Sequence, residues 1–258
     1  MRLAQPFALA VLVTAIAATP SLADGVPPAQ TPTTTTTAAP AVAPSATSRT
    51  TVHVDTVFPA AGQLQVNSVP VRVAPNPKAR VIKVMHQFRS DYRIQEILAL
   101  STTLGKDGKP WYQISIPMRP NGTKGWIPAR SVSVKPTVSQ IVVNRGARTI
   151  DIYWHGKRAV HATVAIGAPG RETPVGHYYV AARFVPDDPF LGVFAVETSA
   201  YSKLTEWPGG GVVGIHGTSA PQLLGQAVSH GCVRMSNEAA MVLKKLVPLG
   251  TPITIAQR

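Results

Sequence analysis

Cysteine is almost absent from this chain: Cys232 is the one such residue among 258. A single cysteine cannot form an intramolecular disulfide, which excludes a disulfide framework. No second cysteine and no carboxylate completes a familiar zinc-ligand spacing around it. Composition alone therefore leaves two interpretations of Cys232, a small buried side chain or a reactive thiol.

Charged residues are also few, and acidic ones are the scarcest. Asp and Glu number 12 against 25 Lys and Arg, charged residues make up 14% of the chain, and the isoelectric point is about 10.3. Such basicity favours polyanionic surroundings: nucleic acid, anionic lipid or an acidic cell envelope. The sequence has no basic run longer than two residues, no zinc-finger spacing and no aromatic stacking motif. These absences argue against nucleic acid as the partner. We therefore expect no nucleic-acid partner and a surface suited to anionic cell-envelope polymers.

The first apolar run, residues 7–18, is too short for an ordinary membrane span. Arg2 precedes the run, and Ser21-Leu22-Ala23 resembles an A-x-A cleavage site. We predict a secretory signal peptide over residues 1–23, cleaved after Ala23, with an uncleaved anchor as the alternative. Export would place the protein in the periplasm or at the cell wall or extracellular face. The run is not followed by a cysteine, which excludes a bacterial lipoprotein anchor.

Composition divides the next hundred residues into two parts. Residues 24–50 are mainly Pro, Ala and Thr with almost no charge, and they hold nothing to bury. We predict a disordered linker there. Residues 51–135 show short β segments separated by turn residues, and Asp107-Gly108 and Asn121-Gly122 are strong hairpin turns. A small β domain is therefore predicted after the linker.

Three patterns in residues 51–135 resemble a bacterial SH3-like domain. They are V-x-V-R-x-x-P at 69–75, G-K-P-W-Y-Q-I at 108–114 and K-G-W-I-P at 124–128. The resemblance implies a small β-barrel. Trp111, Tyr112 and Trp126 would either line a ligand groove or fill the core of this barrel. The core interpretation is favoured, because large aromatic side chains dominate small cores.

Residues 136–258 show the alternation of apolar and polar positions that is typical of strands, with one helical segment near the end. The predicted strands cover residues 138–143, 149–154, 160–166, 178–184, 193–197, 212–216 and 252–255. A helix is predicted over residues 238–247, capped by Ser236 or Asn237. Its core-facing stripe is predicted to consist of Ala239, Val242, Leu243 and Leu246.

The candidate reactive side chains lie in one stretch, residues 214–237, which reads GIHGTSAPQLLGQAVSHGCVRMSN. It holds Cys232 with two histidines, His216 and His230. A cysteine attacks as the thiolate and needs a base or a cation nearby, so this grouping indicates a nucleophile. His230 and Cys232 would share a face if the chain is extended there. A three-ligand zinc site formed by the same side chains is the rival interpretation.

The string S-H-G-C-V-R-M-S-N at 229–237 and the upstream I-H-G at 215–217 resemble the L,D-transpeptidase catalytic domain of the YkuD type. A second feature of that family, T-P-x-G, is present at 173–176. The resemblance extends from about Thr137 to the last residue. It implies a mainly β fold: an SH3-like small barrel over residues 51–135, followed by a YkuD-type β-sandwich with one packed helix over residues 136–258.

The resemblance implies a role for each residue at the centre of the motif. Cys232 would be the nucleophile and His216 its base, with the imidazole oriented by the backbone carbonyl of Gly217. Gly231 would permit close approach of the substrate and let main-chain N–H groups face a developing oxyanion. The resemblance implies neither a cofactor nor a metal.

The flanking positions are open to more than one interpretation. His230 would tune the thiolate or hold the loop by a hydrogen bond. Arg234 would bind a substrate carboxylate, stabilise the thiolate or form a structural salt bridge. Ser229 is interpreted as a local turn hydrogen bond and Asn237 as a helix cap. The cleft is predicted to be lined by Tyr201, Trp207 and the glycines at 209–211.

By resemblance, the reaction is acyl transfer on peptidoglycan stem peptides through a Cys232 thioester, which gives 3→3 cross-links. Carbapenem β-lactams, which mimic the acyl donor, would acylate Cys232. Three alternatives stay open. The acceptor could be a protein or water instead of a second stem peptide. The chain could be a non-catalytic wall-binding protein led by its SH3-like domain, or a zinc hydrolase.

Overall fold

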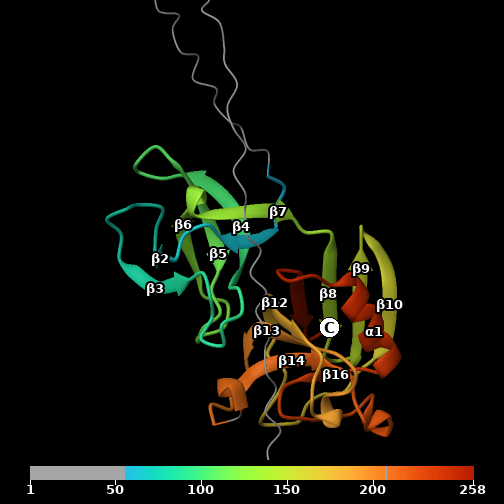
Figure 1. Ribbon diagram of the computed structural model, residues 1–258. Coiled ribbons are helices and arrows are strands. Elements are labelled where there is room, and N and C mark those ends of the chain that lie inside the picture. Colours follow the sequence, from blue (N-terminus) through green and yellow to red (C-terminus); the bar gives the residue numbers. More distant parts are fainter. Residues whose placement is uncertain (1–55, 207) are drawn as a thin grey trace, which may run out of the picture. The chain divides into compact units, whose positions relative to one another are not determined.

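The computed structural model describes residues 56–206 and 208–258. The predicted signal peptide, the predicted linker and the first residues of the predicted SH3-like domain, 51–55, lie outside the described residues, as does Trp207. Within the described ranges, none of the helices has both the length and the apolar character that crossing a membrane requires. The described residues form two β-modules, one after the other in sequence (Figure 1).

The first β-module covers residues 60–136 and is one seven-stranded sheet. Its strands are β1 (Ala60–Leu64), β2 (Ser68–Arg72), β3 (Val81–His86), β4 (Glu96–Leu104), β5 (Pro110–Ser115), β6 (Lys124–Pro128) and β7 (Val132–Pro136). All pairings are antiparallel, and the strand order is β3-β2-β6-β5-β4-β1-β7. The predicted turns at Gly108 and Gly122 join β4 to β5 and β5 to β6, and both glycines have positive φ angles. Strand β7 was not predicted, and it contains Pro136.

Large aromatic side chains fill this module instead of lining a groove on it. Trp111 is 1% exposed, and its indole N–H donates to the Asp107 carboxylate at 3.0 Å. Tyr112 is buried in a cluster that includes Ile97, Ile114 and other apolar side chains of the sheet. The core interpretation is therefore correct for Trp111 and Tyr112, whereas Trp126 is only half-buried.

The second β-module covers residues 139–256 and contains an eight-stranded and a two-stranded sheet. The large sheet has the strands β8 (Ser139–Asn144), β9 (Thr149–Trp154), β10 (Lys157–Thr163), β12 (Gly176–Phe184), β13 (Ala195–Tyr201), β14 (Val212–His216), β16 (Val233–Arg234) and β17 (Pro252–Ala256). Their order is β10-β9-β8-β17-β12-β13-β14-β16. The small sheet pairs β11 (Ile166–Gly167) with β15 (Ala227–Ser229). Alternation along β9 buries Ile150 and Ile152 completely, while Trp154 is 46% exposed at its end.

One α-helix, α1 (Asn237–Leu246), is present among the described residues. Ser236 caps it by accepting a hydrogen bond from the Ala239 N–H, so the first of the two predicted caps is correct. The buried face of α1 is formed by Ala239, Ala240 and Leu243. The predicted stripe was therefore wrong by part of a turn, since Ala240 replaces Val242 and Leu246, which are half-buried.

The described chain is mainly β with a single packed α-helix, as predicted. Buried contacts also join the two β-modules. Leu98 of β4 packs with Tyr179 and Ala181 of β12, and the Tyr179 hydroxyl donates to the Glu96 carbonyl at 3.2 Å. The described residues of both β-modules accordingly belong to one compact unit.

Candidate active site

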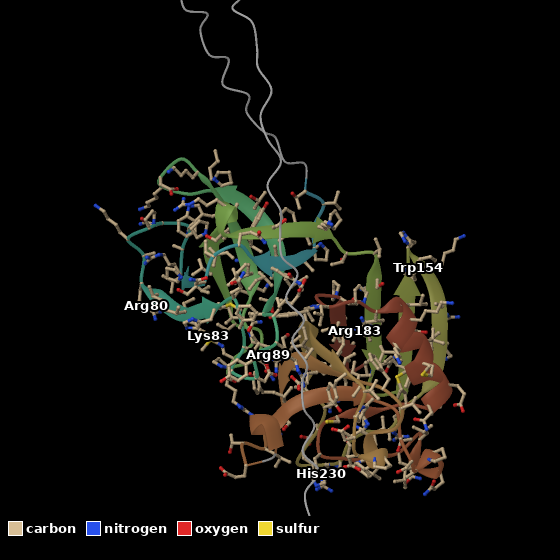
Figure 2. The ribbon with its side chains drawn as sticks, in the orientation of Figure 1. Arg80, Lys83, Arg89, Trp154, Arg183 and His230 are labelled. Carbon is tan, nitrogen blue, oxygen red and sulfur yellow. The ribbon has the colours of Figure 1, made fainter. Side chains whose placement is uncertain are left out.

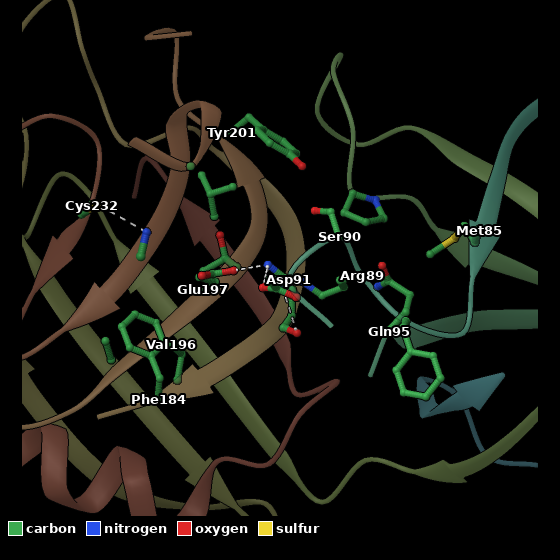
Figure 3. Close-up of a pocket in the computed structure, with 18 of the residues that line it drawn as sticks. Met85, Arg89, Ser90, Asp91, Gln95, Phe184, Val196, Glu197, Tyr201 and Cys232 are labelled. Carbon is green, nitrogen blue, oxygen red and sulfur yellow. Dashed lines mark hydrogen bonds and ion pairs between the residues drawn. The ribbon is translucent and has the colours of Figure 1, made fainter. Parts of the chain in front are cut away.

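Two parallel strands bring the motif residues together. Strand β14 ends at His216, and its neighbour β16 begins at Val233. Ile215 pairs with Val233 and His216 with Arg234. Cys232, which immediately precedes β16, therefore lies beside the end of β14 although sixteen residues separate it from His216 in sequence. Figure 3 shows Cys232 at the edge of a cavity that opens over these strands.

Gly214 is the point where the two side chains meet. Its amide N–H donates to the Cys232 Sγ at 3.3 Å (Figure 3). A Cβ on Gly214 would lie 3.7 Å from the Cys232 sulfur and also 3.7 Å from Cδ2 of His216. The thiol and the imidazole thus flank the same small space, and both line the cavity. Sequence analysis did not single out Gly214, because a backbone donor leaves no signal in the residue type.

His216 is buried, and one neighbour determines which of its ring nitrogens carries the proton. It is 3% exposed, and its Nδ1 lies 2.6 Å from the carbonyl oxygen of Gly217. A carbonyl can only accept, so Nδ1 carries the proton and Nε2 keeps its lone pair. Burial lowers the pKa of His216 to about 4, and the charge of Arg234 acts in the same direction, while backbone carbonyls of Gly217 and Leu191 oppose it. At neutral pH the imidazole is an uncharged base.

Cys232 is partly accessible and uncharged in its resting state. Burial raises the pKa of its thiol above the ordinary value, against the Gly214 N–H and the charge of Arg234, which both favour the thiolate. With the pKa of His216 lowered, the resting pair at neutral pH is a thiol beside a neutral imidazole. Such a pair suits activation by proton transfer to His216 during attack, instead of a thiolate–imidazolium pair formed beforehand.

The loop before Cys232 is held by the hydroxyl of Ser229. This fully buried hydroxyl donates to the Cys232 carbonyl at 2.6 Å and accepts from the Gly231 N–H at 3.1 Å. Ser229 therefore makes the local hydrogen bonds that its turn interpretation predicts. Gly231 has a φ of +120°, and a Cβ there would lie 2.9 Å from the Ser202 Cβ, so the position requires glycine. Because the Gly231 N–H bonds Ser229, this amide braces the loop in the resting state.

His230, which Figure 2 labels, does not share an extended face with Cys232, because residues 230 and 231 form a bend. The condition for a shared face, an extended chain at these residues, is therefore not met. Partial desolvation lowers the pKa of His230, and the charges of Arg171 and Arg234 add to the effect. Among residues 56–206 and 208–258, no group of three or more His, Cys, Asp or Glu side chains is placed to hold a metal ion. His216, His230 and Cys232 therefore do not form the three-ligand arrangement of the rival interpretation.

Arg234 is a buried cation next to the thiol. It is 7% exposed, and its guanidinium lies over the Phe190 ring at 4.5 Å from the centroid. Within the described ranges, Nε of Arg234 has no hydrogen-bond partner, and no carboxylate lies within ion-pair distance of the guanidinium. The structural salt bridge is thus not formed there. Its charge lowers the pKa of Cys232, which agrees with stabilisation of the thiolate.

Asn237 has a different contact from the predicted cap. Its Oδ1 accepts hydrogen bonds from the Val193 N–H and the Thr218 N–H, each at 3.2 Å. These amides belong to the two loops that flank His216, before β13 and after β14. Asn237 therefore ties the loop that carries the Gly217 carbonyl to the start of α1. Sequence analysis missed this role, because Asn at the start of a helix is an equally good signal for a cap.

The cavity over Cys232 has a volume of about 810 Å³ and is lined by both β-modules. The predicted lining residues Tyr201 and Gly209 contribute to it. Opposite Cys232 lie residues of β3 and of the loop after it, which were not predicted as site residues (Figure 3). Arg89 of this loop forms an ion pair with Glu197 of β13, with 2.5 Å between Nη2 and Oε2. The first β-module is thus a wall of the candidate active site.

Comparison with known proteins agrees with the resemblance of the motif. Residues 139–255 match the family model described as the L,D-transpeptidase catalytic domain, YkuD. A curated protein of Bacillus subtilis (strain 168), an L,D-transpeptidase named YkuD, is 34% identical over 116 residues, which is 45% of this chain and 64% of that protein. The chain thus spans less than two thirds of the length of this relative.

Solved structures to which the chain is similar include L,D-transpeptidases. One from Mycobacterium tuberculosis H37Rv is 16% identical with a TM-score of 0.42, over 78% of this chain and 97% of that one. Another, LdtMt1 in complex with imipenem, is 17% identical with a TM-score of 0.39, over 57% of this chain and 90% of that one.

Proposed function

We propose that the chain is a cysteine-dependent L,D-transpeptidase that acts on peptidoglycan stem peptides. The observation that carries the proposal is the relation of Cys232, His216 and Gly217 at one wall of the cavity. Gly217 fixes the tautomer of His216, and the thiol and the imidazole flank the space beside Gly214. The arrangement lies within the residues that match the L,D-transpeptidase catalytic domain.

The first half of the proposed reaction forms a thioester. Nε2 of His216 takes the proton from the Cys232 thiol while Sγ attacks the amide carbonyl carbon after the third stem residue. The carbonyl oxygen becomes an oxyanion, and the carbon–sulfur bond forms. When the tetrahedral intermediate collapses, the carbon–nitrogen bond breaks and Nε2–H returns the proton to the leaving amine. The product is the acyl-enzyme and free terminal D-Ala.

The second half transfers the acyl group to an amine. The side-chain amine of another stem peptide attacks the thioester carbonyl and gives up a proton to His216. The carbon–sulfur bond then breaks, and the proton returns to Sγ, so the enzyme is restored. The result is a 3→3 cross-link, and neither half of the reaction requires a cofactor. A protein amine or water in place of the second stem peptide gives the sister reactions, protein attachment or L,D-carboxypeptidase hydrolysis.

The remaining parts of the proposal concern location and inhibition. The sequence before residue 24 supports export, which would bring the enzyme to the peptidoglycan and to anionic envelope polymers. A carbapenem carries a strained amide that the Cys232 thiol would open in the same way as the donor amide. We further propose that the first β-module is of the SH3-like kind, on the patterns at 69–75, 108–114 and 124–128.

The test is incubation of the purified protein with tetrapeptide muropeptides, followed by mass spectrometry. We expect loss of D-Ala and a cross-linked dimer, and an acyl adduct on the peptide that contains Cys232 when the reaction is stopped early. Hydrolysed tripeptides without dimers would assign the acceptor to water. A Cys232→Ala variant that retains the activity would overturn the proposal and favour a wall-binding protein.

A further inference from the structure

The first β-module supplies a continuous part of the cavity wall. Residues 83–86 of β3 line the cavity, as do residues 88–91 of the following loop. Three of these carry charge at neutral pH: Lys83, Arg89 and Asp91. Figure 2 shows Lys83 and Arg89 on the side of the module that faces the second one. Charged groups on the wall of a substrate cavity affect which substrates bind.

Arg89 links this part of the cavity wall to strands β12 and β13 of the second β-module. Its guanidinium bonds Glu197 at 2.5 Å and the Ala181 carbonyl at 3.4 Å, both in the second β-module. Asp91 lies 3.1 Å from the same guanidinium. Arg89 is thus compensated by two carboxylates. Glu197 of β13 pairs in turn with Gly214 of β14, and the Gly214 N–H donates to the Cys232 sulfur. This one strand pairing therefore fixes the position of the wall relative to the thiol.

Lys83 has no such compensation among the described residues. Its Nζ donates to the Pro117 carbonyl at 2.9 Å, and none of the described carboxylates lies within 4.0 Å of it. The side chain is half-buried, and desolvation lowers its pKa. A half-buried ammonium with one neutral acceptor has hydrogen-bonding capacity left, because it carries three donors. A carboxylate that enters the cavity would therefore find a charge to pair with.

We propose that Lys83 binds a carboxylate of the peptide substrate, so that the first β-module takes part in substrate recognition. The inference rests on the proposed function, since it needs an anionic peptide whose scissile amide is at Cys232. Cys232 and Lys83 both line the same cavity of about 810 Å³, the thiol on one wall and Lys83 on another. The negative charges of Asp91 and Glu197 are balanced by two guanidinium groups, Arg89 and Arg93, so they do not repel this substrate.

The experiment compares two synthetic tetrapeptide substrates, one with its side-chain carboxylates free and one with carboxamides in their place. The variant Lys83→Gln removes the charge but keeps an N–H that can donate to the Pro117 carbonyl. Lys83→Arg keeps the charge. Lys124→Gln is the matched control, because Lys124 is exposed on β6 of the same module and away from the cavity. The readouts are KM and kcat for D-Ala release, with the melting temperature of each variant.

We expect the wild type to prefer the acid, and Lys83→Gln to raise KM for the acid about three- to tenfold with kcat nearly unchanged. The KM for the amide should not change, and Lys83→Arg should restore most of the preference. A purely structural Lys83 would lower the melting temperature without changing the ratio of the two KM values.

Equal KM values of the wild type for acid and amide would overturn the inference without any variant, as would an unchanged ratio in Lys83→Gln. Failure of the proposed function gives a different pattern. The wild type and Lys124→Gln would then both be inactive on both substrates, and the inference would fall with it.

Discussion

The amide of Gly214 lies 3.3 Å from the sulfur of Cys232 and donates its hydrogen to it. The same residue pairs across the sheet with Glu197, which Arg89 of the first β-module holds by an ion pair. The pairing of Gly214 with Glu197 thus connects Cys232 to the first β-module, which forms the opposite wall of the cavity. The candidate active site is therefore a property of both β-modules, although the motif lies in one.

Replacing His216 by Gln should abolish most of the acyl transfer, because the thiol loses the group that takes its proton. A general base typically contributes 10²- to 10⁴-fold, so we expect a fall in kcat/KM of about that size. D-Ala release from a tetrapeptide muropeptide is the measurement. His177→Gln is a suitable control, since His177 is an exposed residue of β12. Equal losses in the two variants would contradict the assignment.

The dependence of activity on pH should follow His216. Its pKa is lowered to about 4 by burial, and the neutral imidazole is the form that accepts the proton. The required form therefore persists down to about pH 4, and kcat/KM should fall only below that value, instead of near pH 6.5 as for an exposed histidine. Folding stability should decline in the same direction as pH falls from 6.5 towards 4, because the unfolded chain binds the proton first. Profiles of kcat/KM and of urea unfolding from pH 3.5 to 8 test both statements.

The thiol of Cys232 should react slowly with iodoacetamide at pH 7. Burial raises its pKa, so the thiolate that reacts is scarce, and the rate should still be rising at pH 9. Arg234→Gln should slow the reaction further, because the nearby charge that favours the thiolate is removed. Arg234→Lys is the control that keeps this charge. A rate at pH 7 as fast as that of free cysteine would contradict the resting state described above.

Replacing Asn237 by Ala should weaken both stability and activity. The amide of Thr218, a buried residue, and the amide of Val193, an exposed one, would both lose their acceptor, at a cost of about 1–3 kcal/mol that comes mainly from Thr218. The released loop carries Gly217, so kcat should also fall, and the kcat-pH profile should shift as the imidazole loses its fixed orientation. Asn237→Asp keeps the accepting oxygen and should retain much of both properties. Ser236→Ala, which removes only the helix cap, should cost about 1 kcal/mol and leave the pH profile unchanged.

The ion pair between Arg89 and Glu197 should appear as a coupling energy in a double-mutant cycle. Both side chains are about three-quarters buried, so we expect a coupling of about 1 kcal/mol in urea unfolding. Arg89→Met alone should also reduce activity on anionic substrates, because Glu197 then keeps only its longer contact with Arg93, at 3.6 Å, and its negative charge in the cavity is less well compensated. Arg89→Met with Glu197→Gln should recover part of that activity. Additive effects in the cycle would show that the pair does not hold the wall.

Local sequence was sufficient to predict several of the longer elements, although not strands β7, β15 and β16, and to indicate the candidates for the centre of the site. Alternation predicted β9 and β14 at their observed bounds, and α1 within one residue at each end. Cys232, His216 and Gly217 lie in one short motif, so contiguous sequence brings them forward as candidates. Whether each acts as predicted depends on the experiments above.

The other wall of the cavity could not be predicted in this way. Arg89 and Glu197 are 108 residues apart, and the type of neither residue indicates the other as a partner. Gly214 acts through its backbone N–H, which every residue but proline has. The face of α1 was predicted incorrectly for a related reason: which apolar residues are buried depends on how the helix lies on the sheet, and not on its periodicity alone.

Strand β17 lies between β8 and β12, although it follows both of them in sequence. Ile253 pairs with Ile141 on one side and with Tyr178 on the other, so this strand joins the two halves of the large sheet. A growing chain therefore has both halves exposed, each with an open edge, until residue 256 has been synthesised. The large sheet, which carries His216 at the end of β14, is therefore continuous only once β17 has been added between β8 and β12.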